Sequence, residues 1–151
     1  MSKLAIRNLE DKDIPVVEEI FDKYWSGYFR EHLSNKLKFM DMNWIIAEQD
    51  SEVVGVAASR KAPEQMRMYS DTDSVIEFYV AAVKYQGQGI GTALRNERVE
   101  QARKAGYKEA VFFSGETHQD SWAFHDNLDF KRAGEFTAPD GEKGIIWLMK
   151  L

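Results

Sequence analysis

Apolar residues recur along this chain at two spacings, and each spacing predicts a different kind of element. Residues three to four positions apart between Ile14 and Tyr24 predict a first helix, with Asp13 as its N-cap. Gly27 ends this helix, and a second helix is expected over residues 29–39.

Short runs of β-branched and aromatic residues predict the strands. Residues 44–48 and 53–58 flank a polar turn at 49–51 and therefore predict a hairpin. Residues 75–81 predict a strand before a glycine-rich turn, and residues 92–104, which hold neither glycine nor proline, predict the helix after it. The remaining expected elements are a strand at 3–8, a loop at 63–73, a strand at 110–113, a short helix at 121–128, and strands at 131–136 and 144–150 joined by a turn at 139–141.

The expected order is β-α-α-β-β-β-α-β-α-β-β. Hairpins dominate both ends and strand–helix–strand crossovers occupy the middle, so the fold class is α/β, or α+β, with a mixed sheet. No internal repeat, low-complexity segment or Pro/Gly/Ser-rich linker interrupts the sequence. Because the chain has 151 residues, we expect one domain over residues 1–151.

Composition narrows the classes of function. The net charge is −5 without a lysine- or arginine-rich run, which argues against a nucleic-acid partner and against a polybasic membrane anchor. No stretch approaches the roughly 20 apolar residues of a membrane span, and residues 1–7 hold no signal-peptide core, so we expect a cytoplasmic protein with no membrane partner. There is no cysteine and the three histidines are scattered, so no metal site is expected.

The most informative segment is the glycine-rich turn at residues 86–92, between the expected strand and helix. Glycine tolerates positive φ angles and leaves room for a ligand beside the backbone. The first amides of the following helix have no intrahelical partner, and the helix dipole adds partial positive charge there. These features predict a cradle for a pyrophosphate. The alternative is a turn that serves only as a tight connection.

Two common phosphate motifs do not fit this turn. A P-loop needs Gly-Lys-Ser/Thr at its end, and the residue after Gly91 is Thr92 instead of lysine. A dinucleotide fingerprint that starts at Gly87 would need a third glycine at the position of Thr92. The strand-rich N-terminal half also does not repeat as βαβ units, so both ligand classes are unsupported.

The turn does match the Gln/Arg-x-x-Gly-x-Gly/Ala signature of the GNAT acetyltransferase superfamily, with Gln86, Gly89 and Gly91 at the three fixed positions. Residues 121–130 resemble the family's late segment, in which an aromatic pair is followed after a few residues by Gly-Phe. The expected strand order agrees over essentially the whole chain. The resemblance implies a GNAT fold with splayed, parallel fourth and fifth strands, and an acetyl-CoA-dependent N-acetyltransferase.

By this resemblance, acetyl-CoA is the cosubstrate, no metal takes part, and the acetyl group passes directly to a primary amine of a small molecule, protein or peptide in a ternary complex. Five residues instead of the usual four separate Val80 from Gln86, so either Val80 or Ala81 faces the pantetheine arm, opposite residues 114–115, and donates to the oxyanion. The implied cofactor-binding residues are Val80, Ala81, Gln86, Gly87, Gln88, Gly89, Ile90, Gly91 and Thr92.

Glu77 and His125 are the candidate catalytic residues. An alkyl ammonium has a pKa of about 10.4, so a base must remove its proton before attack. Glu77 is a carboxylate in an otherwise apolar strand; the alternative is a solvated residue on the open face of that strand. His125 stands where the family often has the tyrosine that protonates the leaving thiolate. It would otherwise pack against the cofactor, with Tyr79 or Tyr85 as the acid.

The acceptor side is less defined. The family's acceptor region corresponds to an aromatic cluster at residues 24–29 and a polar loop at 65–73, although aromatic clusters more often belong to a core. The alternative function is a non-catalytic acyl-CoA sensor or regulatory module of the same fold. His125 in place of tyrosine keeps that alternative open, and a homodimer is a further arrangement open to the chain.

Overall fold

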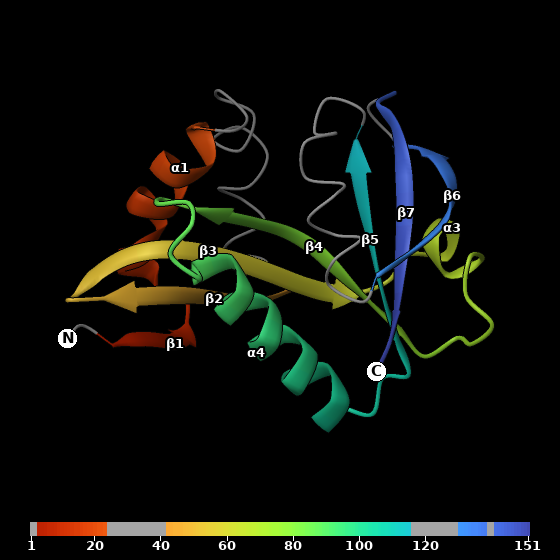
Figure 1. The fold of residues 1–151 in the computed structure, drawn as a ribbon, viewed down its shortest axis with the longest axis horizontal. Helices are drawn as coiled ribbons and strands as arrows, with labels where there is room; N and C mark the ends of the chain where they lie inside the picture. Colours follow the sequence, from red (N-terminus) through yellow and green to blue (C-terminus); the bar gives the residue numbers. More distant parts are fainter. Residues whose placement is uncertain (1–2, 24–41, 116–129, 139–140) are drawn as a thin grey trace. The chain divides into compact units, whose positions relative to one another are not determined.

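The computed structural model of the protein describes residues 3–23, 42–115, 130–138 and 141–151 (Figure 1). The chain forms two compact units. The first comprises Met1–Arg60 and Val80–Arg98, and the second comprises Lys61–Tyr79 and Val99–Leu151. Strand β4 (Val75–Val83) and helix α4 (Ile90–Lys104) contribute residues to both units.

The other described elements match the expected alternation of strands and helices. In chain order they are β1 (Leu4–Asn8), the 3-10 helix η1 (Asp11–Asp13), α1 (Ile14–Asp22), β2 (Met42–Gln49), β3 (Glu52–Lys61), α3 (Glu64–Arg67), β5 (Glu109–Gly115), β6 (Lys131–Thr137) and β7 (Lys143–Lys150).

The seven strands of the described residues form one sheet in the order β1-β2-β3-β4-β5-β7-β6. β4 and β5 run parallel, whereas the pairs β1–β2, β2–β3, β5–β7 and β6–β7 are antiparallel. The predicted α/β class with a mixed sheet is therefore confirmed. None of the described helices has the length and apolar character needed to cross a membrane.

The bounds of most described elements differ from the expected ones by one to three residues; α4, for example, begins at Ile90 and not at residue 92, and β3 extends to Lys61. The first helix ends at Asp22, two residues before the expected end. The segment expected to be a loop at 63–73 contains α3, for which Pro63 is the N-cap with φ −67° and Glu64 lies in the first turn, where a carboxylate is favourable. The expected helices at 29–39 and 121–128 and the turn residues 139–140 lie outside the described residues. The expectation of one domain over residues 1–151 stays a prediction.

Asp13 occupies the expected N-cap position of α1, but its side chain does not cap the helix. Its carboxylate instead accepts the Glu10 N–H at 2.8 Å and two guanidinium hydrogen bonds from Arg7 at 2.8 and 2.9 Å. Arg7 also donates from Nε to Glu48 at 2.8 Å. Because the Asp13 side chain is only 4% exposed, this network fixes the start of α1 to β1 and β2.

Replacing Asp13 with asparagine tests this ion pair. The hydrogen bonds from Arg7 lower the pKa of Asp13 below its ordinary value of 3.8. The carboxylate therefore stabilises the fold above about pH 3.8, and this contribution is lost as pH falls through the lower folded-state pKa. We expect Asp13→Asn to lower the free energy of unfolding by about 1–3 kcal/mol at neutral pH, and by less near about pH 2. Urea unfolding measures both values, and an equal deficit at both pH values would contradict the assignment.

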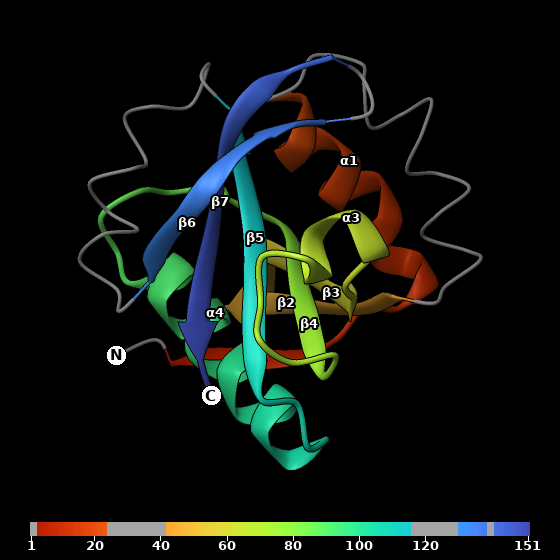
Figure 2. The same ribbon diagram turned by 90° about the vertical axis from the view of Figure 1, so that its right-hand side faces the viewer.

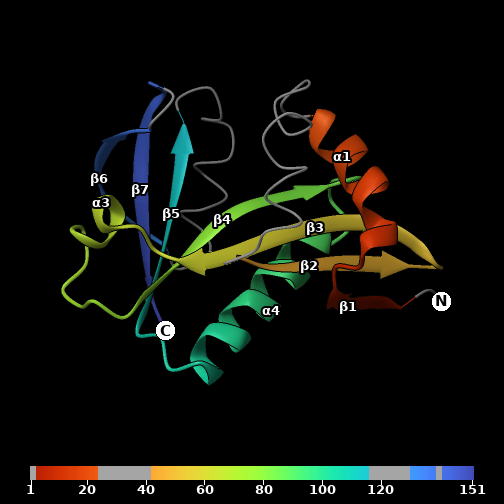
Figure 3. The same ribbon diagram turned by 180° about the vertical axis from the view of Figure 1, so that it is seen from behind.

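In the first unit, α1 and the N-terminal half of α4 lie on opposite faces of β2 and β3 (Figures 1 and 3). On the α1 face, the ring of Phe21 packs edge-on against Trp44, with centroids 6.2 Å apart. The next residue of β2 points to the α4 face, as strand alternation requires. The buried cluster on that face consists of Ile45, Ala47, Val54, Ala57, Ile90 and Leu94.

Gly55 in β3 allows α4 to approach the sheet. A Cβ built on Gly55 would lie 2.7 Å from Cγ2 of Ile90 and 3.0 Å from Cδ1 of Leu94. Ile90 and Leu94 belong to the first two turns of α4 and are 1% and 0% exposed. The absence of a side chain at Gly55 therefore determines how closely the beginning of α4 packs on β3.

Gly55→Ala should push this contact apart. We expect a loss of about 1–3 kcal/mol in the free energy of unfolding, the usual penalty for overpacking. The double variant Gly55→Ala/Ile90→Ala should lose less than the sum of the two single variants, because Ile90→Ala removes the clashing Cγ2. Chemical unfolding of all three variants measures the coupling, and strictly additive losses would contradict it.

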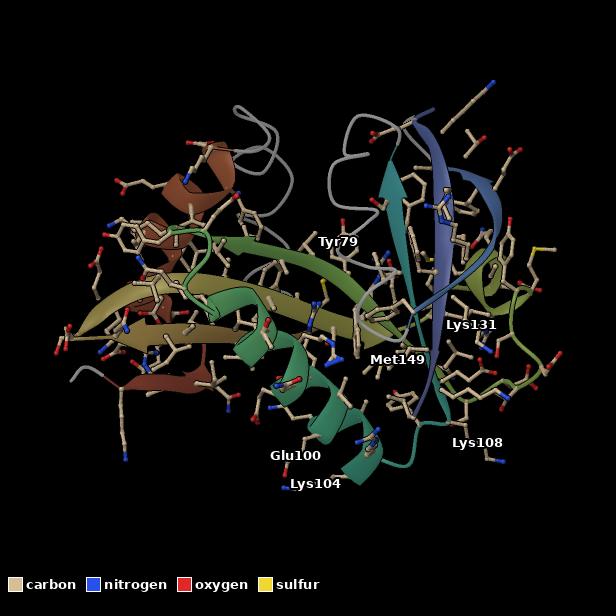
Figure 4. The ribbon with its side chains drawn as sticks, in the orientation of Figure 1. Tyr79, Glu100, Lys104, Lys108, Lys131 and Met149 are labelled. Atoms are coloured by element: carbon tan, nitrogen blue, oxygen red, sulfur yellow. The ribbon has the colours of Figure 1, made fainter. Side chains whose placement is uncertain are left out.

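In the second unit, β5, β7 and β6 lie side by side (Figure 2). The rings of Phe112 and Trp147 stack with centroids 6.0 Å apart and an interplanar angle of 7°. Phe130 packs edge-on to Phe112 at 4.8 Å, and the last turns of α4 belong to the same buried cluster. Glu100 and Lys104 form a 3.2 Å ion pair and point outward from α4 (Figure 4). This half of α4 therefore has one buried and one solvated face.

Candidate functional site

The glycine-rich turn lies in the first unit, between the end of β4 and the beginning of α4 (Figure 1). Gly87 and Gly89 have φ angles of 75° and 77°, a region that strains other residues. A Cβ added to either glycine would meet no atom within 4 Å. The backbone conformation therefore requires glycine, and the space beside the backbone is open at both residues.

The N-terminus of α4 supplies hydrogen-bond donors at this turn. The bond from the Ala93 N–H to the Gly89 carbonyl, 3.0 Å long, begins the helical ladder. The amides of Ile90, Gly91 and Thr92 consequently have no carbonyl of a preceding helical turn to bind. The helix dipole places partial positive charge at the same end. The arrangement suits an anionic group that approaches the open side of the turn.

The residues before the turn are tied to the first unit by several bonds. The Lys84 N–H donates to the Val54 carbonyl at 2.7 Å, and Nζ of Lys23 donates to the Lys84 carbonyl at 2.9 Å. The Glu52 carboxylate accepts hydrogen bonds from Nζ of Lys84 and, at 2.9 Å, from the Tyr85 hydroxyl. These bonds lower the pKa of Glu52 and raise the pKa of Lys84. The hydroxyl of Tyr85, one alternative for the general acid, thus donates a hydrogen bond to a carboxylate.

Arg98 of α4 brings a positive charge to the end of β4. Its Nη1 donates to the carbonyls of Ala58 and Val80, each at 3.3 Å. Burial lowers the pKa of Arg98 to about 10. That value is still well above neutral pH, so the guanidinium is charged. Since β3 and β4 are neighbours in the sheet, one side chain joins the helix to both strands.

The expected cofactor-binding residues lie in the first unit, at residues 80–81 of β4 and at residues 86–92 in the turn and the start of α4, and their side chains differ in exposure. The Ile90 side chain is buried in the core, so this residue offers only its backbone to a ligand. Two of the residues, Val80 and Gly91, are half-buried. The exposed members are Ala81, Gln86, Gly87, Gln88, Gly89 and Thr92.

Glu77 lies on β4 in the second unit and is 3% exposed. The alternative of a solvated carboxylate on an open strand face is therefore wrong. The parallel pairing of β4 with β5 runs from Val75↔Glu109 to Glu77↔Val111, so Glu77 occupies the last of these pairs. Glutamate is almost never fully buried unless it is paired or functional, and Glu77 is therefore retained as a candidate.

Several expected site residues cannot be placed. His125 lies outside the described residues, as does the aromatic cluster at 24–29. In the polar loop, the Tyr69 hydroxyl donates to the Glu135 carbonyl at 2.6 Å, which gives that residue a structural role within the second unit. Among the described residues, no group of three or more His, Cys, Asp or Glu side chains could hold a metal ion.

Sequence reasoning missed Arg98. The residue lies four positions after Leu94 and directly before Val99, both of which are buried. Helical periodicity therefore placed it at the edge of the buried face of α4, which is an unusual position for an arginine. No sequence pattern indicated the hydrogen bonds that Lys84 and Tyr85 donate to Glu52, because both donors lie more than thirty positions after Glu52 in the sequence.

A sequence model of the acetyltransferase (GNAT) family matches residues 6–130 of this chain. The chain therefore belongs to the GNAT acetyltransferase family. No curated protein matches the chain significantly.

Solved structures of several acetyltransferases share the fold over nearly the whole chain. A probable acetyltransferase from Staphylococcus epidermidis ATCC 12228 has a TM-score of 0.81 at 14% identity, covering 98% of this chain and 99% of that chain. The ribosomal-protein-S18-alanine N-acetyltransferase from Escherichia coli has a TM-score of 0.75 at 19% identity, covering 98% and 94%. The PaiA N-acetyltransferase from Thermoplasma acidophilum, in complex with coenzyme A, has a TM-score of 0.72 at 15% identity, covering 99% of both chains.

Gly89→Ala tests whether the open side of the turn holds a ligand. The added Cβ would occupy the free space, so we expect the affinity for coenzyme A to fall at least about tenfold, or 1.4 kcal/mol. Gly106→Ala is the matched control, because Gly106 has φ 88° and equally open surroundings after the other end of α4. Both variants should lose similar stability, whereas only Gly89→Ala should weaken binding in calorimetry. Equal affinities in two folded variants would contradict the cradle.

Proposed function

We propose that the protein transfers an acetyl group from acetyl-CoA to a primary amine by direct transfer in a ternary complex. The glycine-rich turn carries this proposal: two glycines with positive φ, open space beside them and the first amides of α4 fit a pyrophosphate. Membership of the GNAT family favours coenzyme A among pyrophosphate ligands. A protein of the same fold was solved with coenzyme A, which supports this choice.

The charges beside the turn are compatible with this ligand. Nζ of Lys23 binds the backbone carbonyl of Lys84 just before the turn, and the Glu52 carboxylate accepts hydrogen bonds from Lys84 and Tyr85. Such lysines add long-range attraction for the phosphates of coenzyme A. In this proposal the amides of Gly89, Ile90, Gly91 and Thr92 hold the pyrophosphate, and the backbone at Val80 and Ala81 binds the pantetheine arm.

The protonated acceptor loses two protons, one before the attack and one from the nitrogen after it, while the leaving thiolate takes up one, so one proton is released overall. The amine nitrogen bonds to the thioester carbonyl carbon, the carbon–sulfur bond breaks, and the products are an N-acetylamine and the free thiol of coenzyme A. Glu77 accepts the amine proton, directly or through water. An amide of Val80 or Ala81 donates to the oxyanion, and His125 protonates the leaving thiolate.

The acceptor is a small-molecule amine or a protein or peptide amine. The polar loop at 65–73 and residues 24–29 are the proposed acceptor region. A peptide N-terminus belongs among the test acceptors, since one structure of this fold is named for N-acetylation of an alanine of a ribosomal protein. Small amines and polyamines make up the rest of the panel.

The direct test measures free thiol released from acetyl-CoA against this panel, with mass spectrometry of the acetylated product. The proposal predicts thiol and N-acetyl product in equal amounts for at least one acceptor. Tight binding of acetyl-CoA without release for any acceptor would favour the alternative, a non-catalytic acyl-CoA sensor. No binding of acetyl-CoA would overturn both.

Glu77→Gln tests the base while keeping the size of the buried side chain. We expect kcat at neutral pH to fall at least about a hundredfold, within the usual contribution of a general base. The deficit should shrink as pH rises towards the amine pKa of about 10.4, because the acceptor then arrives neutral. Glu100→Gln, which removes an exposed carboxylate of α4, is the control and should leave the pH–rate profile unchanged. A Glu77→Gln deficit that is constant with pH would contradict the assignment.

A further inference from the structure

Arg98 donates a hydrogen bond to a peptide that is proposed to bind the thioester of acetyl-CoA. Nη1 donates to the Val80 carbonyl, which belongs to the peptide linking Val80 to Ala81. The nitrogen of the same peptide is the amide of Ala81. Arg98 therefore binds the carbonyl of a peptide whose N–H, that of Ala81, is one of the two candidate oxyanion donors.

The trans geometry of the peptide fixes the direction of the Ala81 N–H. In a trans peptide the carbonyl and the N–H point to opposite sides, and the described residues contain no cis peptide bond. Because the Val80 carbonyl points at Arg98, the Ala81 N–H points away from the guanidinium. The same guanidinium nitrogen binds the Ala58 carbonyl of β3, so the Ala81 N–H also points away from that contact.

Two backbone hydrogen bonds at the ends of the paired segments indicate an irregular register between residues 75 and 84. The Lys84 N–H bonds to the Val54 carbonyl, and the Ala62 N–H bonds to the Val75 carbonyl. Eight residue steps lead from Val54 in β3 to Ala62 just after it, whereas nine lead from Val75 in β4 to Lys84 just after it. An antiparallel ladder without a bulge would give equal numbers, so β4 holds one extra residue. A bulge leaves backbone groups outside the ladder, where a side chain such as Arg98 can bind them.

The charge of Arg98 also acts on the peptide. A cation that donates to a carbonyl polarises the whole amide and strengthens the N–H as a donor. The effect is larger at a half-buried position than in water, because the local dielectric constant is lower. The position and the charge of Arg98 therefore favour the amide of Ala81 as the oxyanion donor. Ala81 is also exposed, whereas Val80 is half-buried.

We propose that Arg98 is a positioning residue that orients and polarises the Ala81 N–H to bind the thioester oxygen of acetyl-CoA. This inference rests on the proposed function and narrows it. It names Ala81 as the oxyanion donor, and it gives the arginine in α4 a role that does not involve contact with the substrate.

The test is the 13C resonance of the carbonyl carbon of acetyl-CoA, because a stronger hydrogen bond to that oxygen moves the resonance downfield. Binding to the wild-type protein should produce such a shift. Arg98→Met should reduce the shift by about half or more, and Arg98→Lys, which keeps the cation, should restore part of it. Arg95→Met is the matched control, since Arg95 lies one turn earlier in α4 and bonds to its neighbour Asn96 at 2.8 Å.

A second readout separates this role from a general loss of structure. Coenzyme A has no thioester carbonyl, so its affinity should stay within about twofold of the wild type in Arg98→Met. An unchanged carbonyl shift in Arg98→Met would overturn the inference and leave the proposed function intact. A wild-type protein that does not bind acetyl-CoA would instead overturn the proposed function.

If the variants do not fold, the wild-type protein alone tests whether Ala81 is the oxyanion donor. Exchange of bound coenzyme A for acetyl-CoA should shift the amide proton of Ala81 downfield in a 1H–15N spectrum, and the amide of Val80 should change less. A response at Val80 without one at Ala81 would overturn the assignment.

Discussion

The first unit depends on the close packing of α4 against β3 at Gly55. The Cγ2 of Ile90 occupies the place that a side chain at Gly55 would fill. Ile90 directly follows Gly89, so the contact that buries its side chain also fixes the first amides of the helix at the protein surface. The burial of Ile90 and the position of the amides proposed to bind an anion therefore depend on the same packing constraint.

The same helix also contacts the part of β4 that is proposed to bind the thioester. Arg98 lies eight residues after Ile90, a distance of about 12 Å along the axis at 1.5 Å per residue. Its guanidinium donates to the Val80 carbonyl of β4 and to the Ala58 carbonyl of β3. One helix thus carries the amides proposed to bind the phosphates of coenzyme A and supports the backbone proposed to bind its thioester.

Sequence patterns predicted the strands, the mixed sheet and the glycine-rich turn, because each depends on local spacing and on the conformational freedom of glycine. The role of Asp13 was not predictable, since its partner Arg7 competes with the helix end for the carboxylate. Arg98 was missed because an arginine within an apolar stripe is usually interpreted as solvated, and its carbonyl partners lie on two other strands. The acid at His125 stays a prediction outside the described residues.

The most direct test of the account is a titration of 15N-labelled protein with coenzyme A, followed residue by residue through the amide resonances. The account predicts the largest changes at Gly89, Ile90 and Gly91. Gly106, the other glycine with positive φ next to α4, should change little. Binding that leaves the three turn amides unchanged, or no binding at all, would contradict the central claim that this turn holds the pyrophosphate.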